Sequence, residues 1–155
     1  VFRGSELRPV PVPPPLRALP DLGGGVVEKA RGGASVRVTG LERAMVDVLD
    51  APRHGGGWEE IWRSLESVEF FDLEAVTDYA FKLGSSVTVG KVGFYLEQHR
   101  EELMVEDRHL QRLREHAPNR PMYLERGKRE PGKLLPGWNL IVPQRVLNRT
   151  WEEVL

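Results

Sequence analysis

The chain has 155 residues and a formal net charge of −1 at pH 7, with 40% hydrophobic residues, four tryptophans and no cysteine. This length and hydrophobic content suffice for one domain with an ordinary core. The lack of cysteine excludes disulfides and thiolate metal sites, and the near-neutral charge excludes a basic footprint over the whole chain. We find no signal peptide and no apolar run near the ~20 residues of a membrane helix, so we expect a cytoplasmic protein without membrane contact.

Proline dominates the first twenty residues, which hold six of the twelve prolines. Such a run favours polyproline II and does not pair inside a sheet. We therefore interpret residues 1–24 as an arm or linker, in preference to a proline-rich ligand for a partner. Residues 25–155 are assigned to the folded domain.

The domain is expected to open with a β-hairpin. Its strands are Val26–Ala30 and Ala34–Thr39, joined by a turn that contains Gly32 and Gly33. Val36 and Val38 alternate with polar residues, a pattern typical of a strand with one buried face.

Two amphipathic helices should follow across a glycine elbow. Thr39 and Glu42 have the spacing of a capping box, which predicts a helix start. Pro52 and the Gly55–Gly57 run end that helix, and the next one begins at Trp58. The inward faces predicted for the two helices are Leu41, Ala44, Met45, Val48 and Leu49, then Trp58, Ile61, Trp62 and Leu65.

Three more helices are expected in the middle of the chain. Asp72 should cap a helix that ends at Leu83, and Ser86 should cap the next, in which Gly90 and Gly93 would allow a neighbouring helix to approach. A charged helix over 105–116 should turn Leu110 and Leu113 inward. The residues that point inward from the first two are Leu73, Val76, Tyr79, Ala80 and Leu83, then Val89, Val92, Gly93 and Leu96.

The C-terminal part reads as two strands, over 122–126 and 137–143, around a loop at 127–136. Trp138, Leu140 and Val142 alternate as on a buried face. A short closing helix within 144–155 would use Leu147, Trp151 and Val154. The fold class predicted is α+β, with helices around a small, mostly antiparallel sheet and an N-terminal proline-rich arm.

No pattern in the chain indicates catalysis, a metal or a cofactor. Gly84–Lys91 differs from a phosphate-binding loop, because five residues separate its glycines and Val92 replaces the Ser/Thr that binds magnesium, so we interpret it as a joint between helices. Asp47, Asp50 and His54 lack a second histidine at ligand spacing, and we expect the carboxylates to pair with Arg43 or Arg53.

The candidate contact surface is C-terminal, because residues 1–103 carry a net charge of −4 and residues 104–155 a net charge of +3. One helical turn separates two of its arginines, which should project together, and four more cations crowd a glycine-containing loop that would approach a phosphate chain. The alternative is a solvated face balanced by Glu106, Asp107, Glu115, Glu125 and Glu130. The candidate residues for contact with nucleic acid or a partner are Arg108, Arg112, Arg120, Arg126, Lys128, Arg129 and Lys133, with Arg114 beside them.

Three stretches together resemble a known family. They are VTGLERAMVDVLDAPRHGGGWEEIW (38–62), YAFKLGSSVTVGKVGFYLE (79–97) and WNLIVP (138–143). In this order they resemble the C-terminal domain of AbiE-type (AbiEi) antitoxins, which are transcriptional regulators of type IV toxin–antitoxin systems of the abortive-infection class. The likeness covers most of residues 35–143.

The resemblance implies an antitoxin and autoregulator domain that is not an enzyme. It would suppress a cognate nucleotidyltransferase-like toxin without a stable complex, and it would support binding of operator DNA by a winged-helix domain that we expect outside this chain. Two alternatives remain open. One is a stand-alone nucleic-acid-binding module that uses the 120–133 loop, and the other is a structural dimerisation domain that exchanges its proline-rich arm.

Overall fold

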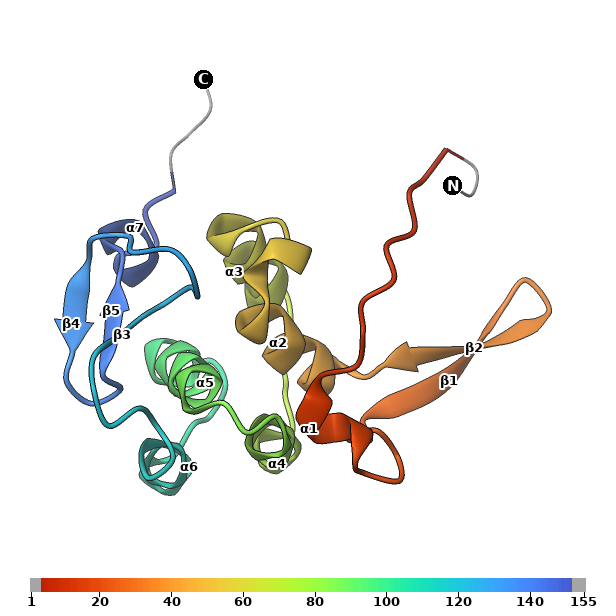
Figure 1. Cartoon of the computed structure of the whole chain (residues 1–155), viewed down its shortest axis with the longest axis horizontal. Helices are drawn as coiled ribbons and strands as arrows, with labels where there is room; N and C mark the ends of the chain where they lie inside the picture. Colours follow the sequence, from red (N-terminus) through yellow and green to blue (C-terminus); the bar gives the residue numbers. More distant parts are fainter. Residues whose placement is uncertain (1–3, 152–155) are drawn as a thin grey trace.

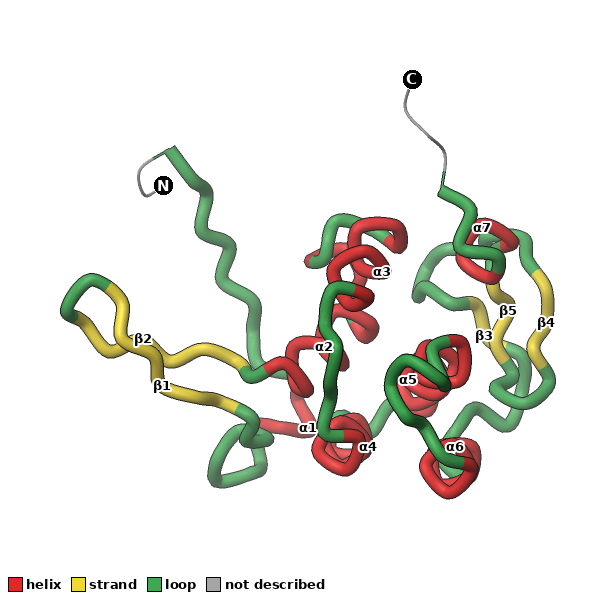
Figure 2. Tube along the Cα trace, turned by 180° about the vertical axis from the view of Figure 1, so that it is seen from behind, coloured by secondary structure: helices red, strands yellow, loops and turns green. Residues whose placement is uncertain are grey.

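The computed structural model describes residues 4–151, and it places a helical body between a small sheet and a projecting β-hairpin (Figures 1 and 2). The helices of the body are α2 (Leu41–Asp50), α3 (Trp58–Glu66), α4 (Leu73–Lys82), α5 (Ser86–Gln98) and α6 (Asp107–Arg114), with the short 3-10 helix η1 (Pro52–His54) after α2. All residues of α5 from Val87 to Leu96 are buried, and α5 contacts α2, α4, α6 and β5. The core therefore lies around α5.

The sheet beside α5 has the strand order β3-β5-β4 and is followed by α7 (Gln144–Leu147). β4 (Lys133–Leu135) pairs with β5 (Leu140–Val142) in antiparallel orientation, whereas β3 (Met122–Tyr123) pairs with β5 in parallel. Buried Trp138, Leu140 and Val142 confirm the predicted face. The α+β class is confirmed, and the helices lie between the two small sheets.

Most local predictions within the helical body are confirmed. The Asp72 carboxylate accepts hydrogen bonds from the backbone N–H groups of Glu74 and Ala75, so it caps α4. The inward faces predicted for α3 and α4 are buried, as are Leu110 and Leu113 of α6. Ser85, one residue before the predicted Ser86, caps α5.

The predicted capping box at the start of α2 is wrong. Gly40 is the N-cap and makes no side-chain cap, while Thr39 ends β2 (Ala34–Thr39). The carboxylate of Glu42 instead accepts a hydrogen bond of 3.0 Å from the backbone N–H of Asp72. Because Asp72 is thirty residues away in sequence, a local pattern of four residues did not reveal this partner.

The buried face of α2 is also rotated from the predicted one. Met45, Val46 and Leu49 are fully buried, whereas Leu41 is 55% exposed. The reason is that α4 and α5 both pack against α2 and extend its buried arc toward Val46. Leu41 is left at the edge of a shallow apolar groove that α2 shares with α3.

The predicted hairpin is confirmed as β1 (Val26–Arg31) and β2, but its predicted buried face is wrong. Gly32 and Gly33 take φ of +55° and +81° in the turn, where a residue with a Cβ would be strained. The hairpin projects from the body, and Val36 is 40% exposed (Figure 2). Alternation predicts two faces, but only a packing partner can bury one.

The proline-rich segment is partly folded. Polyproline II is wrong for Pro14–Arg17, which forms helix α1 with two prolines at its first positions, where a missing N–H costs nothing. Leu16 is fully buried. The side chain of Leu16 thus joins α1 to the core.

Three C-terminal expectations are corrected by packing. The glycines of α5 face the sheet region and not a helix, since a Cβ on Gly93 would collide with the Trp138 ring. β4 lies within the predicted loop, because β5 supplies its hydrogen-bond partners. The closing helix ends at Leu147, and Trp151 packs against the core outside it, while Val154 lies outside the described residues.

Candidate interaction surface

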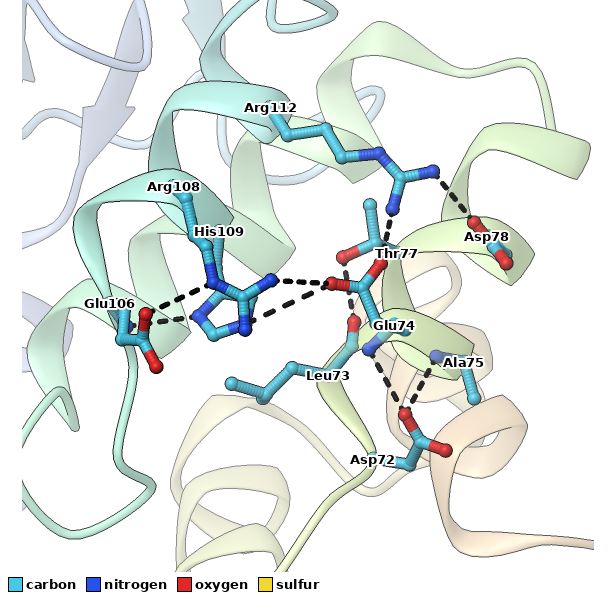
Figure 3. Close-up of polar contacts among 10 residues, drawn as sticks. All are labelled: Asp72, Leu73, Glu74, Ala75, Thr77, Asp78, Glu106, Arg108, His109 and Arg112. Carbon is cyan, nitrogen blue, oxygen red and sulfur yellow. Dashed lines mark hydrogen bonds and ion pairs between the residues drawn. The ribbon is translucent and has the colours of Figure 1, made fainter.

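Arg108 and Arg112 lie in an ion-pair cluster that joins α6 to α4 (Figure 3). The Arg112 guanidinium lies 2.6 Å from Glu74 Oε2 and 2.8 Å from Asp78 Oδ1. Arg108 reaches Glu74 Oε1 at 3.4 Å and Glu106 at 3.0 Å. The two arginines therefore project together, as predicted, but toward carboxylates of the same chain.

Helix caps hold this cluster in place. The Asp72 cap starts α4 and places Glu74 in its first turn, where a carboxylate is stabilised by the helix dipole. Glu106 and His109 form a reciprocal capping box at the start of α6, in which His109 Nδ1 accepts from the Glu106 backbone N–H at 2.9 Å. Both caps lie in the first turns of the helices that carry the ion pairs.

Most of the remaining candidate cations lie in the loop that joins β3 to β4, or at the start of β4, which pairs with β5. Arg126 donates to the Ser85 hydroxyl at 3.0 Å, and Lys128 pairs with Glu125 at 3.4 Å. Within residues 4–151, no carboxylate lies within ion-pair distance of the exposed Arg129 and Lys133. Arg126 also lacks a carboxylate at this distance among the described residues, but it is bonded to Ser85, so Arg129 and Lys133 are the loop cations most available for an anionic partner.

Arg120 does not belong to the same group. It precedes β3, and Met122 of that strand lies opposite Leu140 at the start of β5, whereas Lys133 lies opposite Val142 at the end of β5. Arg120 therefore lies toward the start of β5, whereas the loop reaches β4 at the other end of β5. Arg126, Lys128, Arg129 and Lys133 thus belong to the segment from β3 to the start of β4, and Arg120 lies before it.

A partly buried polar network joins α2 to α4. The Tyr79 hydroxyl donates to Asp47 Oδ1 at 2.6 Å, and Arg43 Nε lies 3.5 Å from Asp47 Oδ2. Burial raises the pKa of Asp47, opposed by the Tyr79 hydrogen bond and by Arg43. The pKa of Tyr79 is raised by burial and by its bond to Asp47. The predicted Asp47–Arg43 pair is present.

Arg43 also holds the glycine-rich segment before β1. Its guanidinium donates to the carbonyl oxygens of Leu22 and Gly24 at 3.1 and 2.6 Å, and it lies 4.9 Å from the centre of the Tyr79 ring. One side chain of α2 therefore fixes where the hairpin leaves the body.

Asp50 has a neutral partner instead of the predicted arginine. Thr88 Oγ1 donates to Asp50 Oδ1 at 2.6 Å and lies 3.1 Å from the Ser85 hydroxyl. Nearby, Lys91 is 1% exposed and donates to the Leu49 carbonyl oxygen at 2.9 Å. Burial lowers the pKa of Lys91 to about 8, and Asp50 opposes this shift. Lys91 ties α5 to the C-terminal end of α2.

These networks contain residues that sequence reasoning missed. Glu74 and Asp78 were not among the expected partners of Arg108 and Arg112, because more than thirty residues separate them in sequence. The sequence places Lys91 in the Gly84–Lys91 stretch, which does not predict that its side chain is buried. Its place on the otherwise apolar stripe of α5 was the signal of a buried lysine.

The described residues offer no assembled metal site and no membrane helix. Within residues 4–151, no group of three or more His, Asp or Glu side chains is placed to hold a metal ion. No helix in this range is long and apolar enough to cross a membrane.

Comparison with known proteins gives no match. No family model, no curated protein and no solved structure is significantly similar to this chain.

Proposed function

We propose that this chain is a non-enzymatic antitoxin and regulator domain of the AbiE type, which suppresses a nucleotidyltransferase-like toxin and supports operator binding by a winged-helix domain. One observation supports it above all: the polar residues that carry the resemblance join α2 to the rest of the fold. Glu42 reaches Asp72, Arg43 holds the glycine-rich segment, Asp47 meets Tyr79 and Asp50 meets Thr88.

This arrangement gives a physical reason for such a pattern to recur in proteins of one fold. The four side chains contact three segments, namely the glycine-rich segment, α4 with its N-cap, and α5, and replacing one partner of such a pair leaves the other without its hydrogen bond. A sequence with the same polar residues at the same spacing would therefore favour the same packing around α2.

The direct test is a growth-rescue experiment. The toxin gene next to this one is induced in a bacterial host, and growth is followed with and without co-expression of the full-length protein that contains this chain. We expect growth to recover with the antitoxin protein and not with an empty vector. Continued growth arrest, at protein levels verified by immunoblot, would refute the proposal.

A second function is favoured by the two unpaired cations of the β3–β4 loop: binding of nucleic acid through phosphate contacts. Arg129 and Lys133 have no carboxylate partner within the described part of the chain, and exposed cations of this kind release counterions when they bind phosphate. The surface is modest, so the affinity should be low and dependent on salt.

Its test compares two double variants by fluorescence anisotropy on a labelled duplex DNA over a range of salt concentrations. Arg129→Gln with Lys133→Gln should lower the slope of log K against log salt by about 2, since each phosphate contact contributes roughly 0.9. Lys29→Gln with Arg31→Gln removes the same charge from the hairpin and should leave the slope unchanged. Equal slopes for the two double variants would exclude the loop as the binding surface.

A further inference from the structure

The β1–β2 hairpin is a two-stranded sheet with both outer edges open. Six residue pairs join its strands in an unbroken register, from Val26 opposite Thr39 to Arg31 opposite Ala34. Apart from this ladder, and within residues 4–151, the only backbone hydrogen bond of residues 26–40 to a segment outside α2 joins Gly40 N–H to Gly25 O. An isolated hairpin of this kind is marginally stable in water, and its edges are templates for another strand.

The two edges differ in how they are protected. β1 carries Glu28, Lys29 and Arg31, and charged residues on an edge strand discourage pairing with another chain. β2 reads Ala-Ser-Val-Arg-Val-Thr and has one charge, Arg37, which lies opposite Glu28 of its own hairpin. It has no proline and no bulge. The β2 edge is therefore the less protected of the two edges.

The two faces of the hairpin also differ. One face holds Val27, Val36 and Val38 together with Ala34; Lys29 lies beside Val36 in its middle, and Arg31 lies beside Ala34 at the turn. Val27 is 43% exposed and Val36 40% exposed, and Val38 is half-buried, so the body of the chain covers this face only in part. The other face holds Ser35, Arg37 and Glu28, whose charges balance.

From these observations we infer that β2 pairs with β2 of a second copy of this chain, in antiparallel orientation about a two-fold axis at Val36. This register places Val36 opposite Val36 of the second copy, Ala34 opposite its Val38, and Ser35 opposite its Arg37. It brings no like charges together, and it joins the two apolar faces into one four-stranded sheet.

Other symmetric registers are less favourable. Pairing through β1 brings like charges together, because it places Glu28 opposite Glu28, Lys29 opposite Lys29, or Lys29 opposite Arg31. A register that avoids these pairs would use Gly24 and Gly25 as strand residues. Their φ values of +69° and +68° are not those of a strand. Sliding β2 by one pair toward its C-terminal end sets Arg37 against Arg37. Sliding it the other way brings in the turn glycine, Gly33.

The inference is independent of the proposed function, and a cysteine scan tests it directly. The chain has no cysteine, so a single introduced thiol reports one contact without interference. Val36→Cys should form an intermolecular disulfide under mild oxidation, because opposed strand residues have Cα atoms at a distance that a disulfide spans. Val27→Cys is the matched control, since it lies on the same face with similar exposure but on the far strand, and it should form no intermolecular disulfide although the chain still associates through β2.

Light scattering after size exclusion provides the second measurement. The unmodified chain should show a concentration-dependent shift from 17.6 kDa toward twice that mass, because an interface this small binds weakly. Val36→Glu should abolish the shift, because the carboxylates of the two copies would meet at the two-fold axis. Within one chain the new carboxylate lies opposite Lys29, so the hairpin itself should persist. Val27→Glu should keep the shift.

Two results would overturn the inference. One is a chain that remains at the monomer mass up to about millimolar concentration, where interfaces at the low end of the size range still associate. The other is disulfide formation by Val27→Cys as fast as by Val36→Cys, which would mean random collision or a different edge. Circular dichroism of each variant confirms that the chain is folded.

Discussion

Lys91 offers a stability test in which the sign of the effect is set by the structure. Its ammonium group is 1% exposed and bonded to the Leu49 carbonyl oxygen. Burial lowers its pKa from 10.5 to about 8. Because the folded state binds the proton more weakly than the unfolded state, the unfolded chain holds more protons between these two values. Stability should therefore rise with pH across that window.

The magnitude follows from the two pKa values. Raising the pH from about 7 to about 9.5 should add about 2 kcal/mol to the free energy of unfolding through this one group. Above about pH 10 the rise in stability from Lys91 is masked by two tyrosines. The pKa values of Tyr79 and Tyr95 are raised in the folded state, which therefore keeps protons that the unfolded state loses. Stability then falls as the pH increases.

The variant Lys91→Met should remove this pH dependence. At neutral pH it relieves a cost of about 3 kcal/mol for the buried charge, and it leaves the Leu49 carbonyl oxygen unbonded at a cost of about 1–3 kcal/mol. We expect the variant to be as stable as the parent chain or up to about 2 kcal/mol more stable.

Urea unfolding followed by tryptophan fluorescence, at half-unit steps from about pH 7 to about pH 9.5, measures both quantities. Lys82→Met on the exposed side of α4 is the control and should keep the parent slope. A flat profile for the parent chain would refute the reasoning, and so would a Lys91→Met variant that keeps the rise or loses several kcal/mol at neutral pH.

Other predictions concern packing and the α4–α6 cluster. Gly93→Ala places a Cβ against the buried Trp138 ring and should cost about 1–3 kcal/mol; an unchanged urea midpoint would contradict this contact. Leu16→Ala should cost about 2–5 kcal/mol if α1 belongs to the core, whereas Leu7→Ala, at a residue 74% exposed, should be silent in the same titration. Glu74→Gln should destabilise the chain by less than ~1 kcal/mol, because its partners are partly exposed, and the loss should shrink at high salt in thermal melts.

Prediction from sequence succeeded where the cause lies within about one helical turn. Asp72 caps α4 through its own next two amides, and Trp58, Ile61, Trp62 and Leu65 share a face because helical spacing places them there. The hairpin turn follows from two adjacent glycines. The same reasoning found the cations of the candidate surface, since charge is a property of composition.

Tertiary structure decided which of these local features acquire partners. Arg108 and Arg112 were candidates for contact with a partner, and the packing of α6 on α4 gave them Glu74 and Asp78 instead. Val36 has the alternation of a buried strand, yet no element of the body covers it.

The sequence by itself therefore determined the five helices of the body, the Asp72 cap of α4 and the hairpin turn, because these depend on residues a few positions apart. Only the folded chain decided the rotation of α2, the burial of Lys91 and Leu16, and the pairing of β4, because each depends on a contact between segments far apart in sequence. Such contacts depend on how whole elements pack, and no local spacing encodes them.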